Sequence, residues 1–369
     1  MNVGIIGATG YGGIELIRFL SSHPKVTALF LSSHSFEGQQ IEAVYPHLYG
    51  QMNSEVSSVL LKAEDVIEKS DVIFSALPHG AGEPFAKLCM ESSKHFIDLS
   101  ADFRFDDDND TFAAWYGKGF VYPELRSSSV YGLPEMNREK IKAQAEKGAM
   151  IIANPGCYPT GASLGIFPAL KNGLLKDDTT IIVDSASGVT GAGREPSRTT
   201  HFAECADNMS PYKVGSHRHT PEIARNAEFM AGKKVPLIFT PHLAPMNRGI
   251  LSTIYVPLCN EWKLSDIVTF PSKEVDGNAK KIHALYEGFY RDEYFVRVLP
   301  FGNIAATRNV RGSNFCDISI HLDHTGTMLI VITAIDNMVK GAAGQAIQNM
   351  NIIMGFEESL GLEILPSVF

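Results

Sequence analysis

Cysteine is scarce in this chain, and basic residues do not dominate its charge. Five cysteines occur in 369 residues, and none forms a CxxC pair or a Cys/His cluster with the spacing of a metal site. We therefore expect reduced thiols, as in a cytoplasmic protein, and no bound metal. The net charge of −9 argues against a general nucleic-acid binder, because phosphate contacts need clustered Lys and Arg.

Long apolar runs are missing as well. The sequence that follows Met1 has no basic segment leading into an apolar one, and no stretch is apolar enough for a bilayer. We expect neither a signal peptide nor a membrane span. There is no internal repeat or low-complexity linker, and the length favours two domains over one.

The first part of the chain alternates short apolar runs with helical or polar segments. This alternation predicts a parallel, doubly wound sheet of the Rossmann type. The expected strands are residues 3–6, 28–31, 72–77, 96–99 and 151–153.

The pattern changes near residue 156, where longer strands begin. Ile250–Val256 and Ile318–Leu322 alternate apolar and polar residues, which is typical of an antiparallel sheet with unlike faces. We therefore expect a second α+β domain over 156–337 with a mostly antiparallel sheet. Its predicted strands are 181–183, 236–239, 250–256, 316–322 and 328–335, and a closing helix is predicted over 339–354.

A glycine-rich turn follows the first strand and opens a helix. Its spacing is GxxGxxG, and glycines at this place let the backbone approach a pyrophosphate and point N–H groups at it. The strand–turn–helix context predicts a dinucleotide site. The candidate cofactor-binding residues of the turn are Gly7, Thr9, Gly10, Tyr11, Gly12 and Gly13.

The second strand is not followed by an acidic residue. NAD enzymes commonly place Asp or Glu there to bind the ribose 2′-hydroxyl, whereas this chain has Ser33 and His34. Hydroxyl and imidazole groups suit a 2′-phosphate, so we predict NADP over NAD. Ser75 and Pro78 lie at the end of the third strand, where the far half of the cofactor would pass, although a simple turn is the alternative.

One cysteine, Cys157, lies where a strand turns into a helix. Pro155, Gly156 and Pro159 surround it with turn residues. A helix N-terminus lowers a thiol pKa, and its backbone N–H groups can hold a developing oxyanion. We interpret Cys157 as a nucleophile, and the other cysteines as ordinary small apolar residues.

A thiol nucleophile needs a base, and the segment His217–Glu222 is the best candidate for it. Alternate residues of an extended segment share a face, so His217 and His219 could both face one site. A charged surface loop is the alternative interpretation.

Together these segments resemble the N-acetyl-γ-glutamyl-phosphate reductase family, which is related to aspartate-semialdehyde dehydrogenase. The resemblance covers almost the whole chain. The matching segments are Gly7–Gly13, Asp98–Arg104, Tyr131–Glu135, Asn154–Gly161, His217–Glu222, Pro241–Gly249 and Val310–Asn314. In one departure, many relatives have Ser-Arg where this chain has Ser33-His34.

The resemblance implies an NADPH-dependent reduction of an acyl phosphate to an aldehyde in arginine biosynthesis, through a thioester on Cys157. It implies that His219, in preference to His217, is the acid/base. The implied substrate-orienting residues are Arg104, Glu222 and Arg248, and the implied nicotinamide-lining residues are Ser187, Gly188 and Asn314.

The resemblance also implies how the chain is organised. The cofactor domain would comprise 1–155 plus 338–369, and the catalytic and dimerisation domain 156–337. We expect a cytoplasmic homo-oligomer, a dimer or tetramer built through the second domain's sheet, with a small-molecule substrate and no nucleic-acid or membrane partner. The alternatives are an aspartate-semialdehyde dehydrogenase and a non-catalytic NADP-binding sensor.

Overall fold

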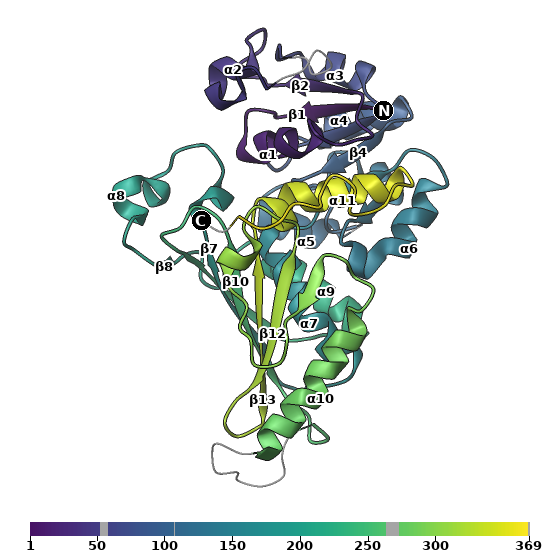
Figure 1. Cartoon of the computed structure of the whole chain (residues 1–369). Helices are drawn as coiled ribbons and strands as arrows, with labels where there is room; N and C mark the ends of the chain where they lie inside the picture. Colours follow the sequence, from purple (N-terminus) through teal and green to yellow (C-terminus); the bar gives the residue numbers. More distant parts are fainter. Residues whose placement is uncertain (52–57, 107, 263–272, 368–369) are drawn as a thin grey trace. The chain divides into compact units, whose positions relative to one another are not determined.

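The computed structural model describes residues 1–51, 58–106, 108–262 and 273–367 (Figure 1). Its contacts divide the chain into two compact units, each with its own sheet. Unit 1 comprises Met1–Gly156 and Ala342–Ile364. Unit 2 comprises Cys157–Gly341 and the tail that begins at Leu365.

Unit 1 contains a six-stranded sheet in which all neighbouring strands are parallel. In spatial order its strands are β2 (Ala28–Ser32), β1 (Asn2–Ile6), β3 (Val72–Ser75), β4 (His95–Asp98), β6 (Ile151–Ala153) and β5 (Ser129–Tyr131). The helices described in this unit are α1 (Tyr11–Leu20), α2 (Ile41–Val44), η1 (Pro46–Leu48), α3 (Ala63–Lys69), α4 (Glu83–Glu91), α5 (Asn109–Tyr116), η2 (Pro123–Ser128), α6 (Pro134–Ala145) and α11 (Gly344–Ile353).

The central strands of this sheet are continuously apolar rather than alternating. Every residue of β3 is buried, and so is every residue of β1 after Asn2, as expected where helices cover a parallel sheet. The carboxyl end of β1 leads into the glycine turn, and the amides of Gly7 and Ala8 donate to the Ser32 carbonyl at 3.0 and 2.9 Å. The turns after β1 and β2 therefore lie side by side at one edge of the sheet.

The closing helix of the chain belongs to unit 1. All residues of α11 are buried. The Asn349 side-chain amide donates to the Gly132 carbonyl at 2.7 Å, and the Asn351 amide oxygen pairs with His23 Nε2 at 3.0 Å. The predicted helix over 339–354 is present, but its first part is a π-helical turn, η6 (Val339–Ala343).

Unit 2 contains a mixed seven-stranded sheet. In spatial order its strands are β11 (Val296–Val298), β12 (Cys316–Leu322), β13 (Met328–Ile335), β10 (Ile250–Pro257), β7 (Ile181–Ser187), β9 (Leu237–Leu243) and β8 (Ser210–Pro211). The pairs β11–β12 and β7–β9 are parallel, and the other neighbours are antiparallel. The helices described in this unit are α7 (Cys157–Lys171), η3 (Val189–Ala192), η4 (Arg198–Thr200), α8 (Phe202–Cys205), α9 (Thr220–Ala231), α10 (Lys273–Phe289) and η5 (Thr307–Val310).

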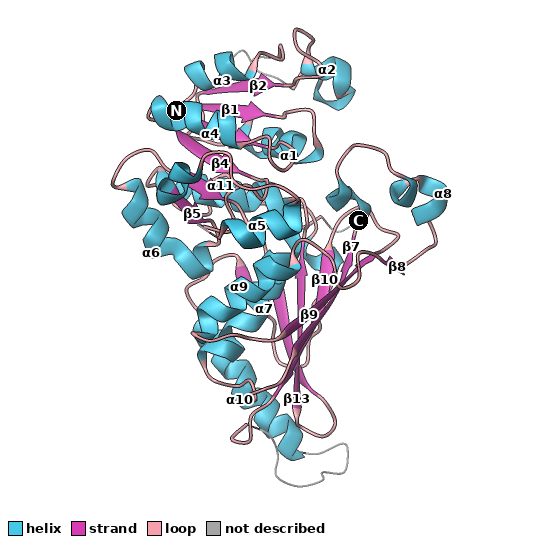
Figure 2. Cartoon of the chain, turned by 180° about the vertical axis from the view of Figure 1, so that it is seen from behind, coloured by secondary structure: helices cyan, strands magenta, loops and turns pink. Residues whose placement is uncertain are grey.

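The long helices of unit 2 cover one face of this sheet. Helix α7 packs against β10 and β13, α9 against β9, and α10 against β12 (Figure 2). Burial alternates strictly along β10, so that Ile250, Ser252, Ile254 and Val256 are buried while the residues between them are partly exposed. Alternation of this kind is what a sheet covered on one face requires.

The predicted fold class is confirmed: a Rossmann-type parallel sheet is joined to a second domain with a mixed, centrally antiparallel sheet. Three short strands, β5, β8 and β11, were not predicted. Nowhere in the described residues is a helix both long and apolar enough to cross a membrane.

Candidate active site

Cys157 is the first residue of helix α7 and is partly exposed. The helix continues with Tyr158 and Pro159, and its residues from Tyr158 to Leu170 are all buried. Proline suits the first turn because the amide it lacks has no partner within the helix. The thiol therefore projects from a helix end whose amides and dipole favour negative charge.

Two tyrosine hydroxyls lie close to this thiol. The hydroxyls of Tyr158 and Tyr212 are hydrogen-bonded at 2.9 Å. Burial raises the pKa of Tyr212 to about 12 and that of Tyr158 further, and the charge of Cys157 adds to both shifts. Both hydroxyls therefore stay protonated at neutral pH and can donate hydrogen bonds beside the sulfur.

His217 packs in an aromatic cluster next to the same helix start. Its ring lies 5.5 Å from the rings of Tyr158 and Tyr212 and 5.4 Å from that of Phe239, measured between centroids. Burial, then the charges of Lys213 and Arg218, lower the pKa of His217 to about 4. His217 is therefore neutral at physiological pH.

The two histidines are in contact. Their ring centroids are 4.9 Å apart, and the His219 backbone N–H donates to His217 Nδ1 at 3.1 Å. An accepting Nδ1 leaves the proton of neutral His217 on Nε2. His219 is also 5.9 Å from the Tyr158 ring, so both histidines lie at the Cys157 end of α7.

Helix α9 begins next to α7 and carries Glu222 in its first turn. The Asn226 side-chain amide of α9 donates to the Ser163 hydroxyl of α7 at 3.0 Å. Glu222 is fully buried, and Pro221 precedes it in the same turn. A carboxylate at this position is stabilised by the positive end of its own helix.

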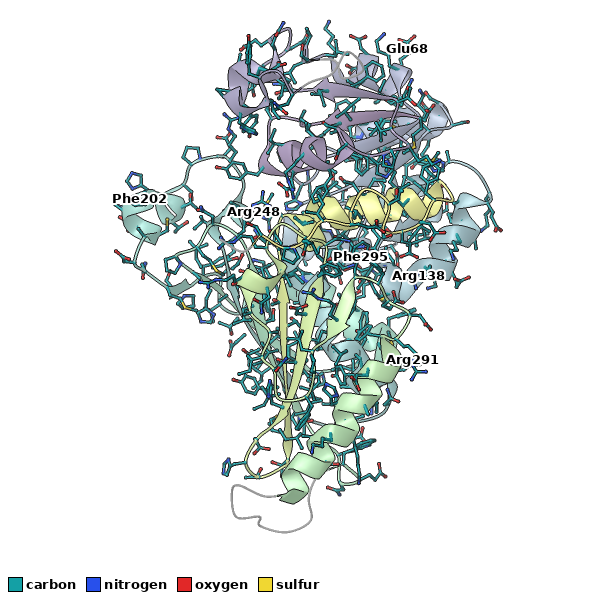
Figure 3. All side chains as sticks on the ribbon, in the orientation of Figure 1. Glu68, Arg138, Phe202, Arg248, Arg291 and Phe295 are labelled. Carbon is teal, nitrogen blue, oxygen red and sulfur yellow. The ribbon has the colours of Figure 1, made fainter. Side chains whose placement is uncertain are left out.

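Arg248, labelled in Figure 3, lies on the turn between β9 and β10. Its Nη1 is 3.5 Å from Asp336 Oδ2, and Asp336 is completely buried at the end of β13. The Asp336 carboxylate also accepts the backbone N–H groups of Gly312 and Met338 at 2.7 and 2.8 Å. Asp336 thus fixes one side of a partly exposed guanidinium group.

The turn after β7 is bonded through its backbone to the turn that carries Arg248. Gly188 N–H donates to the Gly249 carbonyl at 2.9 Å, and the Ser187 hydroxyl donates to the Gly188 carbonyl at 3.0 Å. A Cβ on Gly188 would lie 2.5 Å from the Asn247 carbonyl oxygen, so only glycine fits. Asn314 is fully buried two residues after Gly312, whose amide donates to Asp336.

In unit 1, the glycine turn leads into helix α1 without a side chain that caps the first backbone N–H groups of the helix. Gly7 has a φ of +87°, and a Cβ on Gly13 would lie 2.4 Å from the Gly7 carbonyl oxygen. No side chain caps α1 at Gly10, and its first backbone bond runs from Ile14 N–H to the Gly10 carbonyl at 2.9 Å. The amides of Tyr11, Gly12 and Gly13 therefore remain at the helix end for an anion.

Hydroxyl groups surround the turn after β2. The Thr9 and Ser33 hydroxyls are hydrogen-bonded at 2.7 Å, Ser33 is buried, and His34 is exposed. Ser75 is fully buried at the end of β3, and Pro78 is exposed three residues later. The structure thus brings the unit 1 cofactor candidates to the carboxyl ends of neighbouring strands.

Arg104 belongs to unit 1, whereas Glu222 and Arg248 belong to unit 2. The Arg104 guanidinium group is buried and donates to the carbonyls of Asn154 and Leu99 at 2.8 and 2.9 Å. These bonds tie together the segments that follow β4 and β6.

Two features were missed in the sequence. Tyr212 stands five residues before His217 but carries no recognisable motif. The carboxylates of Asp98 and Asp102 lie four residues apart within the matching segment Asp98–Arg104, and no role was predicted for them. Burial, then the charge of Asp102, raises the pKa of Asp98, and Asp102 accepts the amides of Gly80 and Gly82 at 2.5 and 3.1 Å.

Among the residues that the structure describes, no three His, Cys, Asp or Glu side chains come together as metal ligands.

Comparison with known proteins gives two family matches. Residues 2–144 match the semialdehyde dehydrogenase NAD binding domain, and residues 157–337 match the semialdehyde dehydrogenase dimerisation domain. The chain is 51% identical over 369 residues to the N-acetyl-gamma-glutamyl-phosphate reductase of Clostridium beijerinckii, covering 100% of both chains. It is 46% identical over 372 residues to that of Brachyspira hyodysenteriae, again covering 100% of both.

Solved structures of similar fold have low sequence identity. Aspartate semialdehyde dehydrogenase II from Vibrio cholerae matches with a TM-score of 0.69 and 17% identity, over 96% of this chain and 98% of that one. The Candida albicans aspartate semialdehyde dehydrogenase with NADP matches with a TM-score of 0.66 and 15% identity, over the same shares. These likenesses bear on the fold alone.

Proposed function

The chain belongs to the N-acetyl-γ-glutamyl-phosphate reductases of the semialdehyde dehydrogenase family, and we propose on this basis how it carries out their reaction. It reduces N-acetyl-γ-glutamyl phosphate to N-acetylglutamate 5-semialdehyde and releases phosphate, with NADPH as reductant, in arginine biosynthesis. The observation that supports the mechanism best is Cys157 at the start of α7, beside two histidines and two tyrosine hydroxyls.

Cys157 is the nucleophile. Its thiolate attacks the acyl carbon, the bond from that carbon to the phosphate oxygen breaks, and phosphate leaves a thioester on the sulfur. Amides at the start of α7 hold the oxyanion, where loss of one donor typically costs about 10²–10³ in rate. The charge of Cys157 raises the pKa of Tyr158 and Tyr212, so both hydroxyls stay protonated in the vicinity of the sulfur.

His219 is the acid/base. Neutral His217 has its Nδ1 occupied by the His219 amide and carries a proton on Nε2, so it acts as a hydrogen-bond donor. The proton that the thiohemiacetal oxygen needs after reduction therefore comes from His219. In the collapse that follows, the hydroxyl proton returns to His219 and the bond from carbon to sulfur breaks, which releases the aldehyde and regenerates the thiolate.

The described residues fit a dinucleotide with a 2′-phosphate. A Cβ on Gly7 or Gly13 would collide with a backbone carbonyl oxygen, so both positions need glycine. The turn that they form leaves the amides at the start of α1 open to a pyrophosphate. Thr9, Ser33 and His34 offer hydroxyls and an imidazole in place of a carboxylate. The remaining cofactor candidates are Gly10, Tyr11, Gly12, Ser75, Pro78, Ser187, Gly188 and Asn314. Bound NADPH supplies the hydride that reduces the thioester.

The substrate carries a phosphate and a carboxylate, which call for guanidinium groups. Arg248 is suited to this role because Asp336 orients it while part of the side chain stays exposed. Glu222 and Arg104 complete the set of substrate-orienting groups that we propose.

The uncovered face of the unit 2 sheet supports a homodimer. Ile182 and Ile238 pair directly on this face, 37% and 53% exposed, and Tyr255 is the neighbour of Ile182 on β10. A second copy of the chain is the occupant we propose, within a cytoplasmic enzyme, as the scarcity of cysteine favours.

The reverse reaction tests the proposed activity. Purified protein given N-acetylglutamate semialdehyde, phosphate and NADP should form NADPH, whereas aspartate semialdehyde should give little. A preference for aspartate semialdehyde would instead support the aspartate-semialdehyde dehydrogenase alternative. Tight NADP binding without turnover on either aldehyde would support a non-catalytic sensor.

A further inference from the structure

Gly341 lies directly against the nucleophile's own carbon atoms. A Cβ built on Gly341 would be 2.8 Å from Cys157 Cβ and 3.2 Å from Cys157 Cα. Neither atom is the movable end of a side chain, so any residue other than glycine must displace the cysteine itself. Both residues belong to unit 2.

The backbone that brings Gly341 to this place is the π-helical turn η6. Gly341 N–H donates to the Asp336 carbonyl at 3.0 Å, five residues back instead of the four of an α-helix. Turns of this kind are rare in proteins, and those that occur are often found at functional sites. Asp336 is itself held by the amides of Gly312 and Met338, so the turn is anchored at its base.

The position of the Cys157 Cβ also sets where its partly exposed side chain lies relative to its surroundings. Gly341 closes one side of this Cβ, and the hydroxyls of Tyr158 and Tyr212 lie within reach of the sulfur's charge. A shift of the Cys157 Cβ would carry Sγ away from its place relative to these hydroxyls and to the amides of α7.

We propose that Gly341 is a positioning residue for catalysis, which lets η6 close against Cys157 and so fixes the direction of Sγ. The inference rests on the proposed function in one respect, the role of Cys157 as nucleophile. A misplacement of about 1 Å in a reacting group can cost about 10²-fold in rate. Gly341→Ala should therefore lower kcat roughly 10- to 100-fold while KM stays within about twofold.

The matched control is Gly165→Ala in the same helix as Cys157. A Cβ on Gly165 would lie 2.5 Å from Ile254 Cδ1 and 2.8 Å from Thr333 Cγ2, so this variant suffers a steric conflict two turns away from the thiol. It should lose thermal stability but keep a kcat close to that of the unmodified chain. Alkylation of Cys157 by iodoacetamide should be slowed in Gly341→Ala and unchanged in Gly165→Ala.

A double-mutant cycle tests the contact even if Gly341→Ala folds poorly. Cys157→Gly removes the Cβ that the new methyl group meets, so Gly341→Ala should lower the unfolding midpoint much less in the Cys157→Gly background. Equal lowering in both backgrounds would overturn the proposal. So would an unchanged kcat in Gly341→Ala, or an equal fall of kcat in Gly165→Ala.

Cys157→Ser separates this inference from the proposed function. If Cys157→Ser retains turnover, the nucleophile assignment fails. If Cys157→Ser is inactive while Gly341→Ala is fully active with unaltered alkylation, only the role of Gly341 fails.

Discussion

His217 is held neutral by its surroundings, and this decides how the two histidines divide their work. Burial among aromatic rings is the main cause of its pKa of about 4, and Lys213 and Arg218 add to it. Its Nδ1 is occupied by a backbone amide, so protonation there would break a hydrogen bond as well as bury a charge. In the mechanism that we propose, His217 therefore serves as a fixed hydrogen-bond donor and His219 is the partner that exchanges protons.

This environment predicts a pH-dependent loss of stability. The unfolded state binds a proton at His217 below a pH of about 6.5, whereas the folded state does so only below a pH of about 4. As the pH falls through this window, the free energy of unfolding should drop by roughly 3 kcal/mol because of His217. Urea denaturation of the unmodified chain and of His217→Gln, from pH 8 to pH 4, measures this.

The pH 8 value serves as the internal control, because there both side chains are neutral and the difference reports packing alone. As the pH falls towards 4, the free energy of unfolding of the unmodified chain should drop relative to that of His217→Gln. Parallel curves across the whole range would contradict the neutral, buried His217.

At the scale of elements, two glycines at the start of α1 have different roles: Gly13 is needed for folding, and Gly10 for cofactor binding. A Cβ on Gly13 would lie 2.4 Å from the Gly7 carbonyl oxygen, whereas one on Gly10 meets no protein atom closer than 3.5 Å. Gly10 also has an ordinary extended conformation, with φ −79° and ψ 165°. The structure thus needs Gly13 for packing and leaves the space at Gly10 for a ligand.

We therefore predict opposite effects for two alanine variants. Gly10→Ala should keep its melting temperature but raise the Kd for NADPH about tenfold or more, because the methyl group takes up the space of the pyrophosphate. Gly13→Ala should instead lose stability. Calorimetric titration with NADPH and thermal unfolding measure the two quantities, and an unchanged Kd in Gly10→Ala would place the pyrophosphate elsewhere.

The longer elements could be predicted from the sequence because their patterns are local. Strand β10 alternates over eight residues, and the glycine turn has its spacing within seven. Strands β5, β8 and β11 have only two or three residues, too few to show a period, and each contains a polar residue, whereas the equally short β6 is an entirely apolar run. The π-helical turn η6 was hidden because its apolar residues continue the pattern of α11.

The site could be predicted in part for the same reason. Cys157 has turn residues on both sides, and His217 and His219 are spaced two apart, so both signals are local. The anchoring of Arg248 by Asp336 joins residues far apart in the sequence, and no pattern reports it. The contact of Gly341 with Cys157 likewise exists only in the folded chain.

At the scale of the whole molecule, the helices that the structure describes in unit 2 cover only one face of its sheet. Ile182, Ile238 and Tyr255 are neighbours on the other face. Contiguous apolar residues on an exposed sheet commonly mark an interface. Burial of these residues in a dimer interface would also prevent their non-specific association with other proteins.

A charge on this face should therefore dissociate the homodimer that we propose. Ile238→Lys is expected to halve the mass in sedimentation experiments while leaving the circular dichroism of the chain unchanged, because a buried ammonium is costly. Val121→Lys in unit 1 is the matched control, since Val121 is 54% exposed and Ile238 is 53% exposed. An Ile238→Lys protein of unaltered mass would place the interface elsewhere.

The central claim is that one sulfur takes up the acyl group before reduction, and it can be measured directly. The enzyme is mixed with N-acetyl-γ-glutamyl phosphate in the absence of NADPH, quenched in acid, digested and analysed by mass spectrometry. The account predicts one phosphate released per chain and an N-acetylglutamyl group on the peptide that contains Cys157. Release of phosphate only when NADPH is present, with no acyl group on Cys157, would contradict it.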